Sequence, residues 1–322
     1  MKLIFSILFF NILNIAFSQQ WVEFTQQNRY NQYITPASAG LNNYLDAVVA
    51  HRTQYVGLAD RAISTQFISV SAPIVDNKFG VGVRFVNDQI GYQNYLAPEL
   101  ALSYHIDIND LKLSFGLSGG FTQIRLDGTQ LRAVSGSYAD GTIIHNDDNI
   151  PNISVGGLSP TFSSGVLANY KKFSFGVAVQ NANSPEVSFE TNTSGTFIEL
   201  NRTINLHSSY VIKLNKINLI PSTFYKTDFV KHQLLTTLMI DMRNIFLGMA
   251  FRGYSGFNND AIAGIFGFKI KEAFSVGYSY DYNVSGINNS SSGSHEISIR
   301  YHNLLNFKEK KSGNIMHNPR FL

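Results

Sequence analysis

The sequence predicts an all-β protein, a single transmembrane antiparallel β-barrel of about 14 strands. Three observations predict this fold class: apolar and polar residues alternate strictly, long and short connections alternate along the chain, and charged residues are few. Charged residues are 15% of the 322 residues, against roughly 25% in an average soluble domain. The mean hydropathy of -0.03 is too low for a bundle of membrane-spanning helices, so a chain that enters a membrane as strands fits both values.

Alternation with a period of two residues is the dominant pattern in the chain. In the segment 79–85 every second residue is Phe or Val, and Gly or Arg lies between them. The segments 111–118, 173–180 and 274–281 repeat the pattern with Leu, Phe, Val and Tyr on one face. Because side chains alternate across a strand, each segment has one apolar and one polar face. Segments of this kind begin near Tyr44, Ala62, Phe79, Gln93, Leu111, Phe162, Phe173, Arg202, Ile217, His232, Asn244, Ala261, Ala273 and Ser294.

The connections between these segments are alternately short and long. Short turns are expected near residues 76–77, 108–110, 171–172, 214–216, 241–243 and 271–272, and the longest connections are Asp127–Thr161, Ala182–Asn201 and Val284–Gly293. Transmembrane barrels follow this rule, with short turns on the periplasmic side and long loops outside. The polar face of a soluble β-sandwich would meet water, and it would carry more Lys and Glu than the Gly, Ser and Ala found here. The barrel is therefore the preferred prediction.

Residues 1–18 have the pattern of a secretory signal peptide. Lys2 supplies the positive end, the following residues are mostly apolar, and Ala16 and Ser18 are small residues where a signal peptidase reads. Cleavage is expected before Gln19, and the protein is expected to reach the outer membrane by export. A retained membrane anchor is the alternative, but the apolar run is short for a spanning helix.

Three further parts are expected after the cleavage site. Residues 19–43 are polar and aromatic without a clear period, so they are expected either to plug the lumen or to lie along the periplasmic rim. Residues 44–303 are expected to form the outer-membrane β-barrel, in contact with outer-membrane lipid. Residues 304–322 are expected to be a periplasmic tail. Its lysines fit lipid headgroups or an acidic partner, and a disordered tail fits equally well.

The composition excludes several classes of function. The chain has no cysteine, which excludes disulfides, thiol catalysis and Cys-ligated metals. The formal net charge of +3 is too small to indicate a nucleic-acid partner. No local signature joins a serine to a histidine and an acid, so no catalytic residues are predicted and no enzyme is expected. No cofactor is predicted either, because the glycines at 116–120 lie within a strand pattern and no helix follows them.

The dipeptide His295-Glu296 invites a metal-site hypothesis, but its spacing argues against one. A zinc-binding helix needs a second His four residues after the first, where this chain has Ile299. Asp147 and Asp148, in the longest connection, lack the spacing of a calcium-binding loop. No metal site is therefore predicted.

Charged residues on the polar face of the last two strands predict a cluster inside the barrel. Glu296 and Arg300 share one face of the closing strand, and Asp281 on the preceding strand is expected to face inward as well. Charge inside a narrow barrel persists only when it is paired or hydrated. We therefore predict a lumenal polar cluster of Asp281, Glu296 and Arg300.

Several short motifs resemble those of one known family. The segment 35–40 is similar to a start motif Asn-Pro-Ala-x-x-Gly, with Thr35 in place of Asn, and 52–55 is similar to an Arg-x-Gln-aromatic motif. The Leu-Ser-x-Gly strand at 113–116 and the Pro-Arg-aromatic end at 319–321 also match. The ending is the most distinctive part, with Tyr-Asp-Tyr at 280–282 and Gly-Ser-His-Glu-Ile at 293–297.

On these motifs the chain resembles the PorP/SprF family of outer-membrane proteins, from the type IX secretion and gliding motility system of Bacteroidetes. The positions that carry the resemblance include Pro36, Ala37, Gly40, Arg52, Gln54, Tyr280, Asp281, His295 and Glu296. By this resemblance, His295 and Glu296 mark the start of the closing strand, with hydrogen bonding in the lumen or at its rim.

The resemblance implies binding rather than catalysis. Members of the family are outer-membrane barrels without enzymatic activity. Some associate with periplasmic components of the secretion machinery, and others are paired with a secreted surface adhesin that they help to secrete or to hold on the cell. This chain is thus expected to dock such a partner, with Asp127–Thr161 as the outer contact surface. The alternative is an outer-membrane channel for a small solute, which would need a continuous passage through the lumen.

Overall fold

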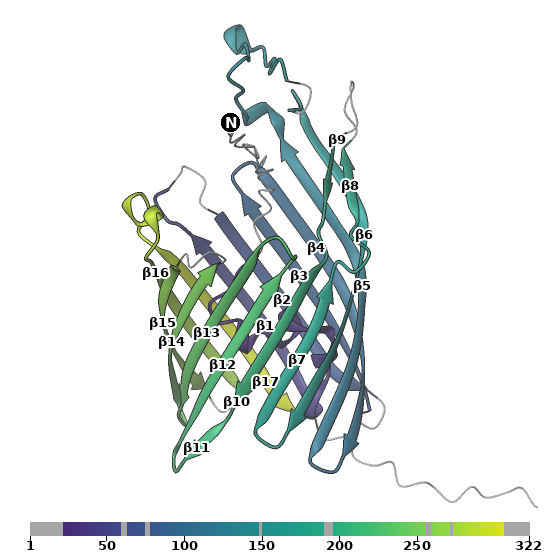
Figure 1. Ribbon diagram of the computed structural model, residues 1–322, viewed down its shortest axis with the longest axis vertical. Coiled ribbons are helices and arrows are strands. Elements are labelled where there is room, and N and C mark those ends of the chain that lie inside the picture. Colours follow the sequence, from purple (N-terminus) through teal and green to yellow (C-terminus); the bar gives the residue numbers. More distant parts are fainter. Residues whose placement is uncertain are drawn as a thin grey trace, which may run out of the picture.

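The computed structural model describes residues 22–58, 63–74, 78–147, 150–189, 196–254, 259–270 and 273–305. These residues form one closed antiparallel β-barrel with a segment of the chain inside it (Figure 1). The expected signal peptide at 1–18, Asp148 and most of the expected tail at 304–322 lie outside the described residues. No helix in the described ranges is long and apolar enough to span a membrane.

The barrel wall has 14 strand positions, because β10 and β11 share one position beside β12 in the 15-stranded sheet. Neighbours in sequence pair with one another, and β1 pairs with β17, from Tyr44 opposite Leu304 to Thr53 opposite His295. This last pairing closes the barrel and confirms the predicted fold class. The wall strands are β1 (Tyr44–Gln54), β2 (Ile63–Ile74), β3 (Phe79–Ile90), β4 (Gln93–Ile108), β5 (Leu111–Asp127), β6 (Ser154–Tyr170), β7 (Phe173–Gln180), β10 (Thr203–Tyr210), β11 (Ile212–Leu214), β12 (Ile217–Thr227), β13 (His232–Asp241), β14 (Ile245–Tyr254), β15 (Asn259–Ile270), β16 (Phe274–Asn283) and β17 (Ser294–Leu304).

One strand start and one hairpin differ from the prediction. Strand β6 begins at Ser154 and not near Phe162. Two glycines and a proline in 154–161 are typical of a loop, so the sequence predicts no strand there. In the structure, β6 pairs with β5 along its whole length, with Asp127 opposite Ser154. The connection Ala182–Asn201 holds a separate two-stranded sheet of β8 (Glu186–Phe189) and β9 (Thr196–Glu199), which the sequence did not predict.

The outer face of the barrel is apolar. Val83, Leu102 and Leu117 are 51%, 56% and 68% exposed, whereas such side chains are usually buried in a soluble protein. On the inner face, charged side chains such as Arg52 and Glu296 are almost completely buried. An apolar outside and a polar inside are what a lipid bilayer requires of a barrel.

The two ends of the barrel carry different connections. Strands β5 and β6 rise above the rest of the wall and carry the connection 128–153, at the top of Figure 1. That connection contains the 3-10 helices η4 (Gly128–Gln130) and η5 (Ala139–Gly141), and η6 (Gly286–Asn289) precedes β17 at the same end. The opposite end has tight links, such as 171–172 between β6 and β7. We call these the long-loop end and the short-turn end.

The interior of the barrel is occupied by residues 22–43, which we call the lumenal segment. It consists of short helices: η1 (Gln27–Arg29), α1 (Asn31–Ile34), η2 (Pro36–Ser38) and η3 (Leu41–Asn43). The rings of Phe24, Tyr30 and Tyr33 pack around Phe67 of β2, with centroids 5.6, 5.6 and 6.0 Å from that of Phe67. The larger of the two hydrophobic clusters thus lies inside the lumen and includes residues of the lumenal segment.

Candidate functional site

A capped turn fixes the path of the lumenal segment. The Thr35 side chain accepts a hydrogen bond from the backbone N–H of Ala37 at 3.2 Å, and Pro36 takes the first position of η2. Thr35 thus provides the capping oxygen that an Asn at this position would provide. Gly40 then has φ +59°, and a Cβ there would lie 2.6 Å from the carbonyl oxygen of Ala72. The turn therefore needs glycine for both its backbone angle and its contact with β2.

Glycines on the inner face of the wall let the lumenal segment approach closely. A Cβ on Gly80 would lie 2.0 Å from the carbonyl oxygen of Ala39, and one on Gly116 would lie 2.2 Å from the backbone nitrogen of Ala37. Both distances are far shorter than a carbon atom tolerates. The glycines within these strand patterns therefore make room for the backbone of η2 and its flanks.

An arginine and two carboxylates form a buried ion network near the long-loop end. Arg52 of β1 lies opposite Glu296 of β17 in the closing pair of strands. Its guanidinium contacts Asp281 of β16 at 2.7 Å and Glu296 at 3.3 Å, and all three side chains are fully buried. Charged groups persist at such burial only when they are paired and hydrogen-bonded.

The two carboxylates of this network bind the lumenal segment. Glu296 accepts hydrogen bonds from the backbone N–H groups of Thr25 and Gln26 at 2.7 and 3.0 Å, and from the Tyr30 hydroxyl at 2.7 Å. Asp281 accepts from the Thr25 hydroxyl at 2.7 Å. Two neighbouring strands of the wall therefore hold one turn of the lumenal segment through charge-assisted hydrogen bonds.

A second arginine extends the network to the lumenal segment's only described glutamate. Arg252 of β14 contacts Asp281 at 3.0 Å and Glu23 at 3.5 Å. Glu23 also accepts hydrogen bonds from the side-chain amides of Gln54 and Gln233, at 3.3 and 2.8 Å. Strands β1, β13, β14, β16 and β17 thus converge on the start of the lumenal segment.

The opposite wall holds the later part of the lumenal segment. Arg84 of β3 pairs with Glu99 of β4 at 2.5 Å and donates to the backbone carbonyl of Gln32 at 3.2 Å. The Ser103 hydroxyl donates to the carbonyl of Ala39 at 2.7 Å. The lumenal segment is therefore attached to both sides of the barrel.

The structure brings together two of the three residues of the predicted lumenal cluster. Asp281 and Glu296 come together, but Arg300 lies apart, and its Nε contacts Asp46 at 2.6 Å. Glu296 and Arg300 are four residues apart on one strand, which places them about 13 Å apart along it. The arginine that joins the two carboxylates is Arg52. The alternation of residues in β1 could have placed Arg52 in the lumen. Its pairing with Asp281 and Glu296 becomes evident only from the closure of β1 on β17.

His295 and Glu296 have separate environments, because adjacent residues of a strand face opposite sides. Glu296 faces the lumen, as described above. The side chain of His295 lies on the outer face of the barrel and not in the lumen. Its Nδ1 lies 2.7 Å from the Tyr278 hydroxyl, and the Tyr280 hydroxyl donates to the Ser292 carbonyl at 2.8 Å. In the described ranges no group of three or more His, Asp or Glu side chains could hold a metal ion.

The fold and its filled lumen define a class of protein: an outer-membrane β-barrel with part of its own chain inside. The CymD monoaromatic hydrocarbon channel is similar in structure, with a TM-score of 0.54 at 12% identity, over 89% of this chain and 94% of that one. Omp33 of Acinetobacter baumannii gives a TM-score of 0.46 at 10% identity, over 81% and 99% of the two chains. A FadL homologue of Pseudomonas aeruginosa gives 0.46 at 10%, over 83% and 92%. At 12% identity, the likeness to CymD shows a shared fold alone.

The family assignment rests on sequence. A family profile described as type IX secretion system membrane protein PorP/SprF matches residues 16–301. The chain therefore belongs to the PorP/SprF family, which confirms the resemblance carried by the motifs. A comparison with curated proteins gave no match. The protein is an outer-membrane protein, as its fold and family both indicate.

Proposed function

We propose that this protein is a non-enzymatic docking barrel of the type IX secretion system. It binds a secreted surface adhesin or a periplasmic component of the secretion machinery and does not conduct a solute. The observation that carries the proposal is the lumenal segment. It lies inside the lumen and is held by Glu296 and Asp281 on one side, and by Arg84 and Ser103 on the other. A barrel that is closed in this way offers surfaces to bind to, not a passage.

The outer contact surface of this proposal is the connection 128–153 on its support of β5 and β6. The connection has internal order, since the buried His145 lies 2.9 Å from the carbonyl of Gly128 and 2.8 Å from the Tyr138 hydroxyl. Apolar side chains on it are open to solvent, among them Val134, which is fully exposed, and Ile153. Apolar groups exposed beyond the membrane are typical of a protein-binding surface.

A second candidate function is a channel for a small solute. It is supported by a cavity of about 470 Å³ between the lumenal segment and the wall, and by the likeness of the fold to CymD, which is a channel. A passage would require the lumenal segment to leave its contacts. Each of those contacts involves a buried charge or backbone group, so leaving them would be costly.

The docking proposal is tested by isolating the tagged full-length protein from outer membranes in mild detergent and identifying its partners by mass spectrometry. A matched variant replaces residues 132–147 with a Gly-Ser linker. We expect the unmodified protein to recover a large secreted protein or secretion components, and the linker variant to lose the outer partner while still inserting as a heat-modifiable barrel. Recovery of the barrel alone, even after gentle cross-linking, would contradict docking and favour the channel.

A further inference from the structure

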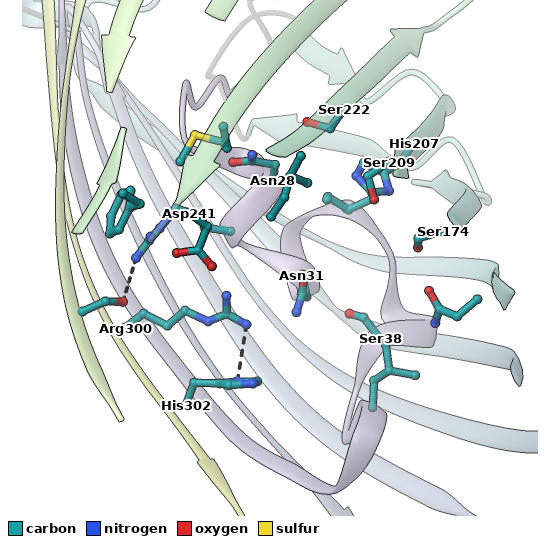
Figure 2. Close-up of a pocket in the computed structure, with 18 of the residues that line it drawn as sticks. Asn28, Asn31, Ser38, Ser174, His207, Ser209, Ser222, Asp241, Arg300 and His302 are labelled. Atoms are coloured by element: carbon teal, nitrogen blue, oxygen red, sulfur yellow. Dashed lines mark hydrogen bonds between the residues drawn. The ribbon is translucent and has the colours of Figure 1, made fainter. Parts of the chain in front are cut away.

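The cavity at the short-turn end has features of a binding site. It has a volume of about 470 Å³, within the range of sites that hold small ligands. The lumenal segment forms one side, and the inner faces of β6, β7, β10 and β12 to β17 form the other (Figure 2). Amides and hydroxyls form part of the lining, including Asn28, Asn31, Asn169, Ser174, Ser209 and Ser222.

Arg29 supplies a cation without a partner carboxylate. Its Nη2 donates to the Ser275 hydroxyl at 2.8 Å, and its guanidinium carbon lies 3.9 Å from the centroid of the Phe246 ring. These contacts fix the guanidinium at the cavity wall. Its Nε is buried without a hydrogen-bond partner, and Arg29 forms no ion pair among the described residues. A fixed guanidinium with an unused donor is suited to an oxyanion.

The other charges at the cavity are already matched. Arg300 contacts Asp46 at 2.6 Å and lies 3.4 Å from His302, while Lys269 pairs with Asp241. Burial, and then the repulsion of Arg300, lowers the pKa of Arg29 to about 10, so Arg29 stays charged at neutral pH. Asp46 and Asp241 also attract Arg29, but these two carboxylates face three cations, so one positive charge is left over for a bound anion.

Two amides add a donor and an acceptor that also lack partners. The Nδ2 of Asn169 and the Oδ1 of Asn28 are buried without hydrogen bonds in the described structure, and both residues line the cavity. A buried polar group without a hydrogen-bond partner is destabilising. The side-chain amides of Asn28 and Asn169 each carry a donor and an acceptor, which match the two polar groups of a peptide bond, whereas a simple oxyanion offers acceptors only.

We propose that this cavity binds an acidic, extended peptide segment of a partner protein, with a side-chain carboxylate on Arg29 and backbone groups against Asn28 and Asn169. Short turns mark the periplasmic end of such barrels, so the partner would approach from the periplasm. The chain's own residues 306–322 are a poor occupant, because Lys308, Lys310 and Lys311 make that stretch basic. This site is separate from the connection 128–153, and its test does not depend on docking there.

The test is a titration of the full-length protein in detergent micelles with a fluorescent pentapeptide, Ser-Glu-Asp-Gly-Ser, followed by anisotropy. The matched peptide is Ser-Gln-Asn-Gly-Ser. We expect the acidic peptide to bind at least about tenfold more tightly, as a buried charge-assisted hydrogen bond allows. We expect Arg29→Gln to remove this preference and Arg29→Lys to keep part of it.

Two further variants keep the test decisive. Lys171→Gln removes a cation at the same end but outside the cavity, where Lys171 pairs with Asp110 and is 58% exposed, and we expect no change in binding. Ser209→Trp fills the cavity without touching a charge, and we expect it to abolish binding of both peptides. If the Arg29→Gln variant does not fold, the binding measured for Ser209→Trp decides whether the cavity is the site. Equal affinity for the two peptides, or unchanged binding by folded Arg29→Gln or Ser209→Trp, would overturn the proposal. Displacement by inorganic phosphate at the peptide's own concentration would also overturn it, in favour of a small-oxyanion site.

Discussion

The two ends of the lumen differ in how completely their charges are matched. Near the long-loop end, Arg52, Asp281 and Glu296 bond with one another and with the lumenal segment, and all three are fully buried. Near the short-turn end, Arg29 has no carboxylate partner among the described residues and borders an open cavity. The difference teaches that a buried charge alone does not mark a binding site. A matched network fastens the chain to itself, and an unmatched group in a cavity is available to a ligand.

The largest expected effect comes from breaking the matched end. Arg52→Met leaves the buried carboxylates of Asp281 and Glu296 without their closest cation, and removing one partner of a buried pair costs about 3–5 kcal/mol. We expect the lumenal segment to become sensitive to limited proteolysis and the unfolding temperature to fall. Arg300→Met, which removes a partly exposed arginine from the same face of the neighbouring strand, is the matched control and should change both much less. Equal effects of the two variants would contradict the special role of the Arg52 network.

A steric change should separate the lumenal segment from the wall. Gly116→Val places a side chain where even a Cβ would lie 2.2 Å from the backbone of Ala37, and overpacking of this kind costs about 1–3 kcal/mol. Proteolysis of the lumenal segment should increase. Gly119 lies on the same strand, and a Cβ there meets the Phe162 ring at 3.4 Å. Gly119→Ala should therefore leave proteolysis unchanged. An effect as large as that of Gly116→Val would show that both substitutions destabilise strand β5, and not its contact with the lumenal segment.

The capped turn should respond to the loss of one hydrogen bond. Thr35→Val removes the oxygen that accepts from the Ala37 N–H and should cost about 1 kcal/mol. Thr35→Asn restores an acceptor of the kind usual at this family position and should be close to neutral. Chemical unfolding of both variants checks this. A stable Thr35→Val together with an unstable Thr35→Asn would show that the cap is not what holds the turn.

The smallest effect is expected on the outer face. His295→Phe loses a hydrogen bond to Tyr278 that is partly open to the surroundings, and such bonds contribute about 0.5–1.5 kcal/mol. Glu296→Gln, one residue on, removes the charge that receives three hydrogen bonds from the lumenal segment and should cost more. Unfolding measurements on both variants compare the two faces of one strand directly. A larger loss for His295→Phe would reverse the assignment of the dipeptide.

Local patterns predicted the wall of the barrel well, because a strand leaves a two-residue period in the sequence. The first half of β6 escaped prediction, since its glycines at 156 and 157 and its Pro160 are typical of loops. The hairpin β8–β9 escaped too, being short and set within a polar connection. In both cases pairing with a neighbouring strand outweighed the local preference.

The candidate site was less predictable than the wall. The alternation of side chains along a strand was enough to place Asp281 and Glu296 in the lumen. Which arginine pairs with them, Arg52 or Arg300, depends on how the barrel closes. That closure joins residues more than two hundred positions apart, which no local pattern records. The path of the lumenal segment has no periodicity, so Arg29 and its cavity could not be found from the sequence.

The central claim is that the lumenal segment closes the barrel, and electrical conductance in a planar lipid bilayer tests it most directly. The full-length protein and a variant that lacks residues 22–43 would be compared at the same voltage and salt concentration. The account predicts no steady conductance for the full-length protein and open pores for the variant, once it has been shown to insert as a barrel. Steady conductance of the full-length protein that the deletion leaves unchanged would contradict it.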